Sequence, residues 1–139
     1  YNVKPKTVIV DCKTDKVSTF DFPCTYNTTD GKLFYTVGSE FSYNTGAYVY
    51  QIKTINPETK EVKDGIFCET ITQKIKEITS PYELYISPYT QNVYFTDAGS
   101  YGSAGYLYGY TKEGQPVFAP QKTYVNPAHI LALPIYENK

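Results

Sequence analysis

The chain has 139 residues, and its 13 Lys and Arg residues against 14 Asp and Glu residues give a formal net charge of −1. This balance leaves no basic patch of the kind that binds nucleic acid, and no apolar run approaches the roughly 20 residues that cross a bilayer. The length suits one domain. The 16 Tyr and 7 Phe residues join Val, Ile and Thr in the periodic segments, which is the composition of β-strands.

Apolar and alternating runs predict strands along most of the chain, and therefore an all-β fold. Residues 38–46 and 98–105 are expected to be loops between strands. In chain order, the expected strands are residues 7–10, 17–20, a segment opened by Pro23, 33–37, 47–55, a strand near Val62, 82–86, 93–97, 106–110, a strand near Val117 and a last strand at 129–133.

Residues 66–78 carry two conflicting signals. Ile71, Ile75 and Ile78 follow the i, i+4, i+7 spacing of one helix face. The same stretch contains β-branched residues such as Thr70 and Thr72, which favour strands. We interpret it as an irregular connection that includes a strand end.

Three turns of similar composition separate expected strands, at residues 11–17, 56–62 and 111–117. Each begins with a side chain that can bond its own backbone, continues through turn-forming residues and ends in Val. This is the chemistry of hairpin turns. Gly114 stands where the first two copies have Thr, and we expect a positive φ there.

A longer repeat covers whole groups of strands. Residues 80–87 and 126–133 both show a polar residue, a proline and then a strand with apolar residues at matching places. Residues 32–36 and 92–96 form a second matching pair. The offset of the first pair lies in the range of about 40 to 50 residues that is typical of propeller blades.

With blade strands named A to D, the chain contains C-D, A-B-C-D, A-B-C-D and A. We therefore predict a single partial β-propeller domain over residues 1–139, with about two and a half four-stranded antiparallel blades that end near residues 22, 80 and 126. Closed propellers have about four to eight blades. The exposed strand edges are expected to pair with another chain or with missing blades.

The second half of the chain resembles a known family, the YncE-like, surface-layer-type seven-bladed propellers exported by gut Gram-negative anaerobes. The resemblance spans about residues 75–133 and concerns the family's C-terminal part. It departs after His129, where Ile130-Leu131-Ala132-Leu133 replace the usual aromatic residues. The motifs that carry it are Pro81-Tyr82-Glu83-Leu84-Tyr85-Ile86-Ser87-Pro88, Asn92-Val93-Tyr94-Phe95-Thr96-Asp97-Ala98-Gly99, Gly105-Tyr106-Leu107-Tyr108 and Pro127-Ala128-His129.

This resemblance implies a location on the extracellular side of the outer membrane or in the periplasm. Some members of the family are surface lipoproteins that capture corrinoids such as cobalamin and pass them to an outer-membrane transporter. It therefore implies a non-enzymatic module that binds a small ligand, with the corrinoid and the transporter as partners and no cofactor of its own.

The two loops between strands B and C carry the best functional signal, because they mix aromatic rings with small polar residues. Tyrosine rings give rigid contact area, and hydroxyls bond adaptably. Alternatively, Tyr43 and Tyr101 pack on a neighbouring blade. The candidate ligand-binding residues are Phe41, Ser42, Tyr43, Asn44, Ser100, Tyr101 and His129.

Other functions remain open at this point. A structural or protein-interaction propeller needs no ligand, and a propeller lyase or hydrolase would need acidic or histidine residues on inner strands, where only Glu83 and His129 occur. Asp97 ends its strand, and its carboxylate either binds a ligand or Ca²⁺ or accepts hydrogen bonds from the following loop amides. One His and no CxxC spacing argue against zinc. The three cysteines allow one disulfide, for example Cys24–Cys68, or three free thiols.

Overall fold

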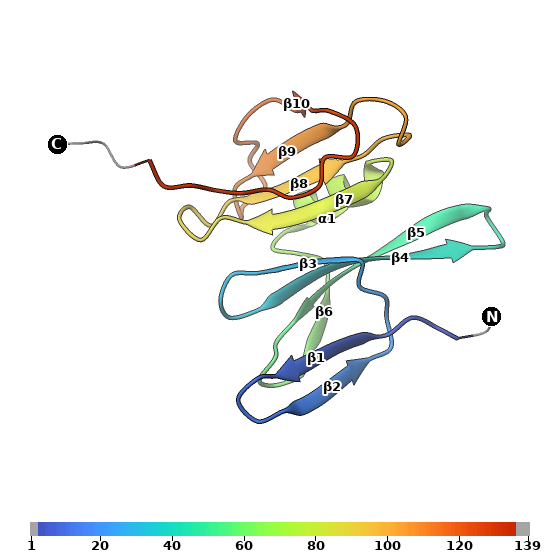
Figure 1. Ribbon diagram of the computed structural model, residues 1–139, viewed down its shortest axis with the longest axis vertical. Coiled ribbons are helices and arrows are strands. Elements are labelled where there is room, and N and C mark those ends of the chain that lie inside the picture. The colour runs from blue at the N-terminus through green and yellow to red at the C-terminus, as the bar shows by residue number, and fades with distance from the viewer. Residues whose placement is uncertain (1–2, 136–139) are drawn as a thin grey trace.

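The computed structural model describes residues 3–135, which form a mostly β structure with one short helix. Its antiparallel sheets have two, four and four strands (Figure 1). Among the described residues there is no closed or propeller arrangement. Within the same part of the chain, no helix is long and apolar enough to cross a membrane.

The strands group largely as the repeat predicts. The two-stranded sheet pairs β1 (Thr7–Asp11) with β2 (Lys16–Phe20). In both four-stranded sheets the spatial order of the strands is the chain order. The first contains β3 (Tyr26–Thr29), β4 (Phe34–Ser42), β5 (Ala47–Ile55) and β6 (Val62–Asp64), and the second β7 (Pro81–Ile86), β8 (Val93–Asp97), β9 (Tyr106–Tyr110) and β10 (Gln121–Lys122).

The turn chemistry is confirmed. The Asp11 carboxylate accepts the Lys13 N–H at 2.9 Å, and the Asn56 side chain accepts the N–H groups of Glu58 and Thr59 at 2.9 and 3.1 Å. Such bonds hold a turn without help from the rest of the fold. At the third turn Gly114 has a φ of 87°, as expected.

The interpretation of residues 66–78 as an irregular connection is wrong. Residues Glu69–Glu77 form α1. Ile71 and Ile75 are fully buried and Ile78 is nearly so, on one face of the helix. Burial of this apolar face outweighs the β preference of the threonines, because tertiary packing provides most of a short helix's stability. Thr72, one of the residues that suggested a strand, instead accepts the Ile66 N–H through its hydroxyl.

Two expected strands near the C-terminus are also corrected. Residues 129–133 form no strand, because Asn126 and His129 adopt φ values of 53° and 67°, and these turn the chain away from extended pairing. The outer strand expected near Val117 is instead the short β10. Pro116, just before Val117, has no N–H to donate to a ladder, and only an isolated bridge joins it to Tyr110.

The predicted loop at residues 38–46 is mostly strand. β4 continues to Ser42 and pairs with β5 down to Ala47, so only residues 43–46 turn. Gly38 lies inside β4, where a Cβ would overlap the carbonyl oxygen of Pro23. The glycine thus marks a close approach of two backbone segments and not a loop.

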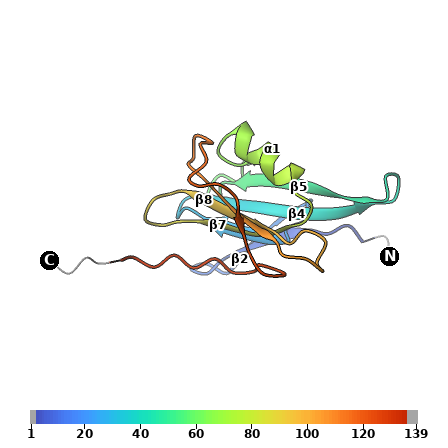
Figure 2. The same ribbon diagram turned by 90° about the horizontal axis from the view of Figure 1, so that it is seen from above.

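The helix and the hairpin lie on opposite sides of the sheets. Figure 2 shows α1 on one side, and β1–β2 and the chain after residue 127 on the other. β3 and β7 lie side by side, and the Ile86 N–H donates to the Thr28 hydroxyl across the seam at 3.3 Å. The shared core contains Tyr35, Val37, Ile52, Ile66, Ile71, Ile75, Ile78, Leu84, Ile86, Val93 and Phe95.

Candidate functional site

Both candidate loops lie at the same end of the molecule. In Figure 1 the β4–β5 turn at residues 43–46 and the β8–β9 loop at residues 98–105 are both at the right-hand end. The β7–β8 turn lies at the opposite end. We call the end that carries the two candidate loops the rim.

Three aromatic rings gather at the tip of the β4–β5 hairpin. Phe41 contacts Tyr43 edge to face at a centroid distance of 5.2 Å, and Tyr48 at 5.4 Å. Phe41 and Tyr48 are also direct partners in the strand register. The Tyr43 side chain is 92% exposed. We call these three residues the tip cluster; it presents apolar ring surface to solvent at the end of a two-stranded arm.

A second group of rings lies where β3 meets β7. Tyr82 contacts Tyr26 at 5.9 Å and Tyr101 at 5.9 Å, the latter edge to face. Tyr101 remains 53% exposed. Burial raises the pKa of Tyr26, and the nearby hydroxyls of Tyr101 and Tyr82 raise it further. We call Tyr26, Tyr82 and Tyr101 the seam cluster.

Tyr50 lies two residues after Tyr48 on β5 and bonds the segment that precedes β7. Its hydroxyl donates to the Thr79 carbonyl at 3.3 Å, which ties β5 to the segment before β7. Burial raises the pKa of Tyr50, and Tyr101, Asp97 and Tyr48 raise it further.

Asp97 holds the β8–β9 loop in place. Its buried carboxylate accepts the Ser80 and Gly99 N–H groups at 2.8 Å each and the Thr79 N–H at 3.3 Å. The Ser80 hydroxyl completes the link by donating to the Gly99 carbonyl at 2.8 Å. The alternative that Asp97 bonds the following loop amides is therefore confirmed.

Tyr101 occupies an uncommon backbone conformation on this loop. Its φ is 61°, a left-handed value that bulky residues rarely adopt. Its N–H donates to the Ala98 carbonyl at 3.2 Å, and the hydroxyls of Ser100 and Ser103 are 3.2 Å apart. A loop anchored by Asp97 thus presents the Tyr101 ring at the rim despite the cost of its backbone conformation.

The structure brings together most, but not all, of the predicted site residues. Phe41 and Tyr43 share the tip cluster, while Ser42 and Asn44 flank it, with Ser42 inside β4. Ser100 and Tyr101 lie on the second loop. His129 is exposed on the chain after β10 and has no hydrogen bond to either loop among the described residues.

Four tyrosines of the rim were missed by sequence reasoning. Tyr48 and Tyr50 are two residues apart on one strand, which places both rings on the same face. Had the hairpin been recognised as a tight turn, the register would have paired Phe41 with Tyr48. Tyr26 and Tyr82 come together across the β3–β7 seam, and no local pattern predicts that contact.

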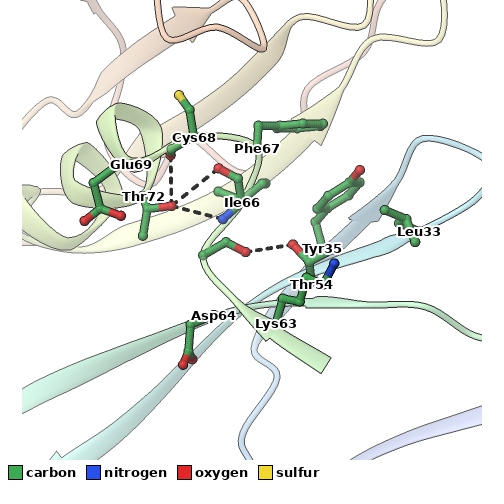
Figure 3. A pocket seen from close by; sticks show the side chains of 11 residues that line it. Leu33, Tyr35, Thr54, Lys63, Asp64, Ile66, Phe67, Cys68, Glu69 and Thr72 are labelled. Carbon is green, nitrogen blue, oxygen red and sulfur yellow. Dashed lines mark hydrogen bonds between the residues drawn. The ribbon is translucent and has the colours of Figure 1, made fainter. Parts of the chain in front are cut away.

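A hollow of about 400 Å³ lies between the start of α1 and the sheet of β3–β6 (Figure 3). Here the Tyr35 ring packs on Phe67 at 4.7 Å, and the Tyr35 hydroxyl donates to Asp30. Burial, followed by this bond, raises the pKa of Tyr35 well above its ordinary value. Thr72 bonds Ile66 and Cys68 through its hydroxyl. The bonds of Thr72 hold the start of α1 beside this hollow.

The described residues contain neither a cluster of metal ligands nor a disulfide. No set of three or more His, Cys, Asp or Glu side chains in residues 3–135 is close enough to hold a metal ion. Cys12, Cys24 and Cys68 are free thiols, so the disulfide suggested between Cys24 and Cys68 is not formed.

Comparisons with known proteins add no assignment. The chain matches no model of a known protein family, and no curated protein is significantly similar to it.

Proposed function

We propose that this chain is a non-enzymatic recognition module, part of a β-propeller, whose rim binds a small ligand with a broad apolar face and polar groups at its edge. A corrinoid such as cobalamin has this chemistry and is the ligand that the resemblance to exported propellers suggests. The mechanism is contact with aromatic rings together with a few hydrogen bonds.

The gathering of aromatic rings at one end carries this proposal. The tip cluster and the seam cluster come from two different loops and from strands in two sheets, yet both lie at the rim. Rigid scaffolds commonly place binding residues on loops at one end. Tyrosine side chains have only two rotatable torsions before the hydroxyl, so ordering them on a ligand costs little entropy.

Each rim residue has a distinct role in the proposed complex. Tyr43 and Tyr101 provide exposed ring surface for the apolar face of the ligand. Ser42, Asn44 and Ser100 supply donors and acceptors for amide groups at its edge. Asp97 contacts no ligand; it holds the loop that presents Tyr101.

The propeller part of the proposal is supported by the strand grouping. A hairpin is followed by two antiparallel sheets of four strands, each in chain order, and the two sheets share a sequence repeat. Further strands, from another chain or from further blades, would complete the ring. The proposed setting is the extracellular side of the outer membrane or the periplasm, with an outer-membrane transporter as the receiving partner.

A structural or protein-interaction propeller is the second candidate. It is favoured by the way the rim rings already contact one another, which takes up part of their surface. Under this alternative, the aromatic rim would pack against protein and would bind no small molecule.

Calorimetry with cyanocobalamin separates the two. The proposal predicts binding to the wild-type chain and a loss of roughly thirtyfold in affinity for Tyr101→Ala, because truncating an anchoring ring typically costs about 2 kcal/mol. Tyr89→Ala is the matched control, since Tyr89 is 59% exposed on the β7–β8 turn at the opposite end. Absence of binding by the wild type would favour the structural alternative, and binding that Tyr101→Ala and Tyr43→Ala both leave intact would reject the site.

A further inference from the structure

We propose that the space between the β1–β2 hairpin and the sheet of β3–β6 is a second binding site, and that its ligand is a short peptide of apolar residues with free termini. In Figure 1 the turn of this hairpin lies at the left-hand end of the molecule, and the rim lies at the right-hand end. The inference is independent of the proposed function, because it concerns other residues and another ligand.

The site is a hollow of about 620 Å³, which we call the hairpin hollow. Its volume falls within the range of about 300 to 1,000 Å³ that is usual for small-molecule sites. A smaller hollow of about 230 Å³, lined by no charged residue, adjoins it and shares Ile9, Val10 and Phe34 with it. The apolar wall of the hairpin hollow consists of Ile9, Val10, Val17, Phe34 and Pro57.

The pairing of the hairpin shows which of its faces is turned toward the sheet. Ile9 and Ser18 are register partners, and both are less exposed than Val10 on the neighbouring position. Asp11 and Lys16 are also partners and lie two residues farther along each strand, so they share the face of Ile9 and Ser18. The inward face of the hairpin is therefore apolar in the middle and charged at the turn.

The two walls of the hairpin hollow are not bonded to each other. Within the described part of the chain, no hydrogen bond or ion pair joins residues 7–20 to residues 26–64. The Thr7 hydroxyl instead donates to the Phe22 carbonyl in the connection that follows the hairpin. A molecule bound between the walls can contact both of them without breaking an existing polar contact.

Charges of both signs stand where two turns border the hairpin hollow. The β1–β2 hairpin contributes Asp11 and Lys16, and the β5–β6 turn contributes Glu58 and Lys60. All four side chains are exposed, and none of them forms an ion pair within residues 3–135. Bonds from the side chains of Asp11 and Asn56 to nearby N–H groups hold the two turns in shape. Each turn thus presents one carboxylate and one ammonium group.

This arrangement selects a ligand that carries both charges and an apolar body. A simple anion or cation meets a like charge for every opposite one. An uncharged apolar molecule covers the charged groups and gives them no partner, which costs free energy. A short apolar peptide offers its carboxylate to the lysines and its ammonium group to the acids, while its side chains bury apolar surface against Ile9 and Phe34.

Titration of the ¹⁵N-labelled chain with leucyl-leucine tests the proposal. We expect saturable shifts in residues 9–18 and 56–60, and affinity at least tenfold lower for N-acetyl-leucyl-leucine amide, which has the same side chains and no charged terminus. Lys16→Gln with Lys60→Gln should weaken leucyl-leucine roughly tenfold and leave the blocked peptide unaffected. Lys13→Gln is the matched control, because Lys13 is exposed on the same hairpin and does not line the hollow.

Absence of shifts at millimolar leucyl-leucine would overturn the proposal, and so would shifts confined to the rim or equal affinity for the two peptides. The comparison of the two peptides uses the wild-type chain, so it decides the point even if the lysine variant fails to fold. If that variant folds and binds leucyl-leucine as the wild type does, the charges do not select the ligand and the proposal is wrong. Failure of cyanocobalamin to bind would count against the proposed function alone, and failure of leucyl-leucine against this site alone.

Discussion

The hydroxyl of Tyr35 donates a 2.8 Å hydrogen bond to the carboxylate of Asp30, across the first turn of the sheet formed by β3–β6. The other oxygen of Asp30 accepts the N–H groups of Lys32 and Leu33 at 3.0 and 2.9 Å. One side chain therefore closes the turn and also fixes a ring of the core. Because both groups titrate, this pair makes stability depend on pH in opposite directions at the two ends of the scale.

Tyr35→Phe should destabilise the protein by somewhat more than about 1 kcal/mol at pH 7. About 1 kcal/mol is the typical net value of one hydrogen bond, and the acceptor of this bond is charged. The raised pKa of Tyr35 means that its contribution is complete below pH ~10, the ordinary tyrosine value, and is lost as pH rises above it. Urea midpoints between pH 8 and pH 11 should therefore fall less steeply in the variant. An equal alkaline loss in both proteins would contradict this assignment.

Asp30→Asn should act at the acid end. Burial alone would raise the pKa of Asp30, but the bonds from Leu33, Tyr35 and Lys32 outweigh it and lower the pKa. The stabilising contribution of Asp30 is thus complete above pH ~4, the ordinary aspartate pKa. It is lost as the pH falls through the pKa of Asp30 in the folded chain. Acid titrations followed by circular dichroism should show a shallower loss of stability in the variant. A steeper acid loss in Asp30→Asn than in the wild type would show that the sign is wrong.

Asp97→Ala should cost about 2–3 kcal/mol, because it leaves buried N–H groups without an acceptor. Asp21→Ala is the control: it removes an exposed ion pair with Lys6, and such pairs contribute about 0–1 kcal/mol. Urea unfolding at neutral pH gives both values. Equal small losses would mean that Asp97 does not hold the loop.

Ile75→Ala should cost about 2–5 kcal/mol, the range for emptying a filled core position. Ile75 is fully buried beneath α1. Gln73→Ala, on the exposed side of the same helix, should change stability by less than about 0.5 kcal/mol. Thermal and urea unfolding of the two variants provide the comparison. A mild effect of Ile75→Ala would indicate that α1 is not docked on the sheets.

Gly38→Ala should destabilise strongly, since its Cβ would overlap the Pro23 carbonyl oxygen, which is backbone and cannot rotate away. Gly102→Ala has open space around its Cβ and should be neutral or slightly stabilising through the unfolded state. Proteolysis rates and melting temperatures would report the difference. Indistinguishable variants would mean that the close approach at Gly38 relaxes at little cost.

The predictable parts of this fold are those that local chemistry controls. The turns at Asp11 and Asn56 depend on bonds between residues two or three apart in sequence, and the strand grouping depends on runs that the repeat marks twice. The helix at Glu69–Glu77 was not predicted correctly, because its stability comes from Ile71 and Ile75 packing on a sheet that is distant in sequence.

The candidate site also combines residues that local sequence predicts with residues that only long-range packing brings together. Tyr43 and Tyr101 could be selected from loop composition alone. Tyr26 and Tyr82 belong to the seam cluster through a contact between two sheets that only the folded chain creates. At residues 129–133 the alternation of the sequence is that of a strand, but left-handed backbone at Asn126 and His129 turns the chain, and this segment pairs with no strand in residues 3–135.

A nuclear magnetic resonance titration of the ¹⁵N-labelled chain with cyanocobalamin tests the central claim most directly, since it locates binding residue by residue. The account predicts saturable shifts concentrated in residues 41–48 and 98–105, with the β7–β8 turn at residues 87–92 unaffected. A spectrum that does not change, or changes confined to the opposite end of the molecule, would contradict a ligand-binding rim.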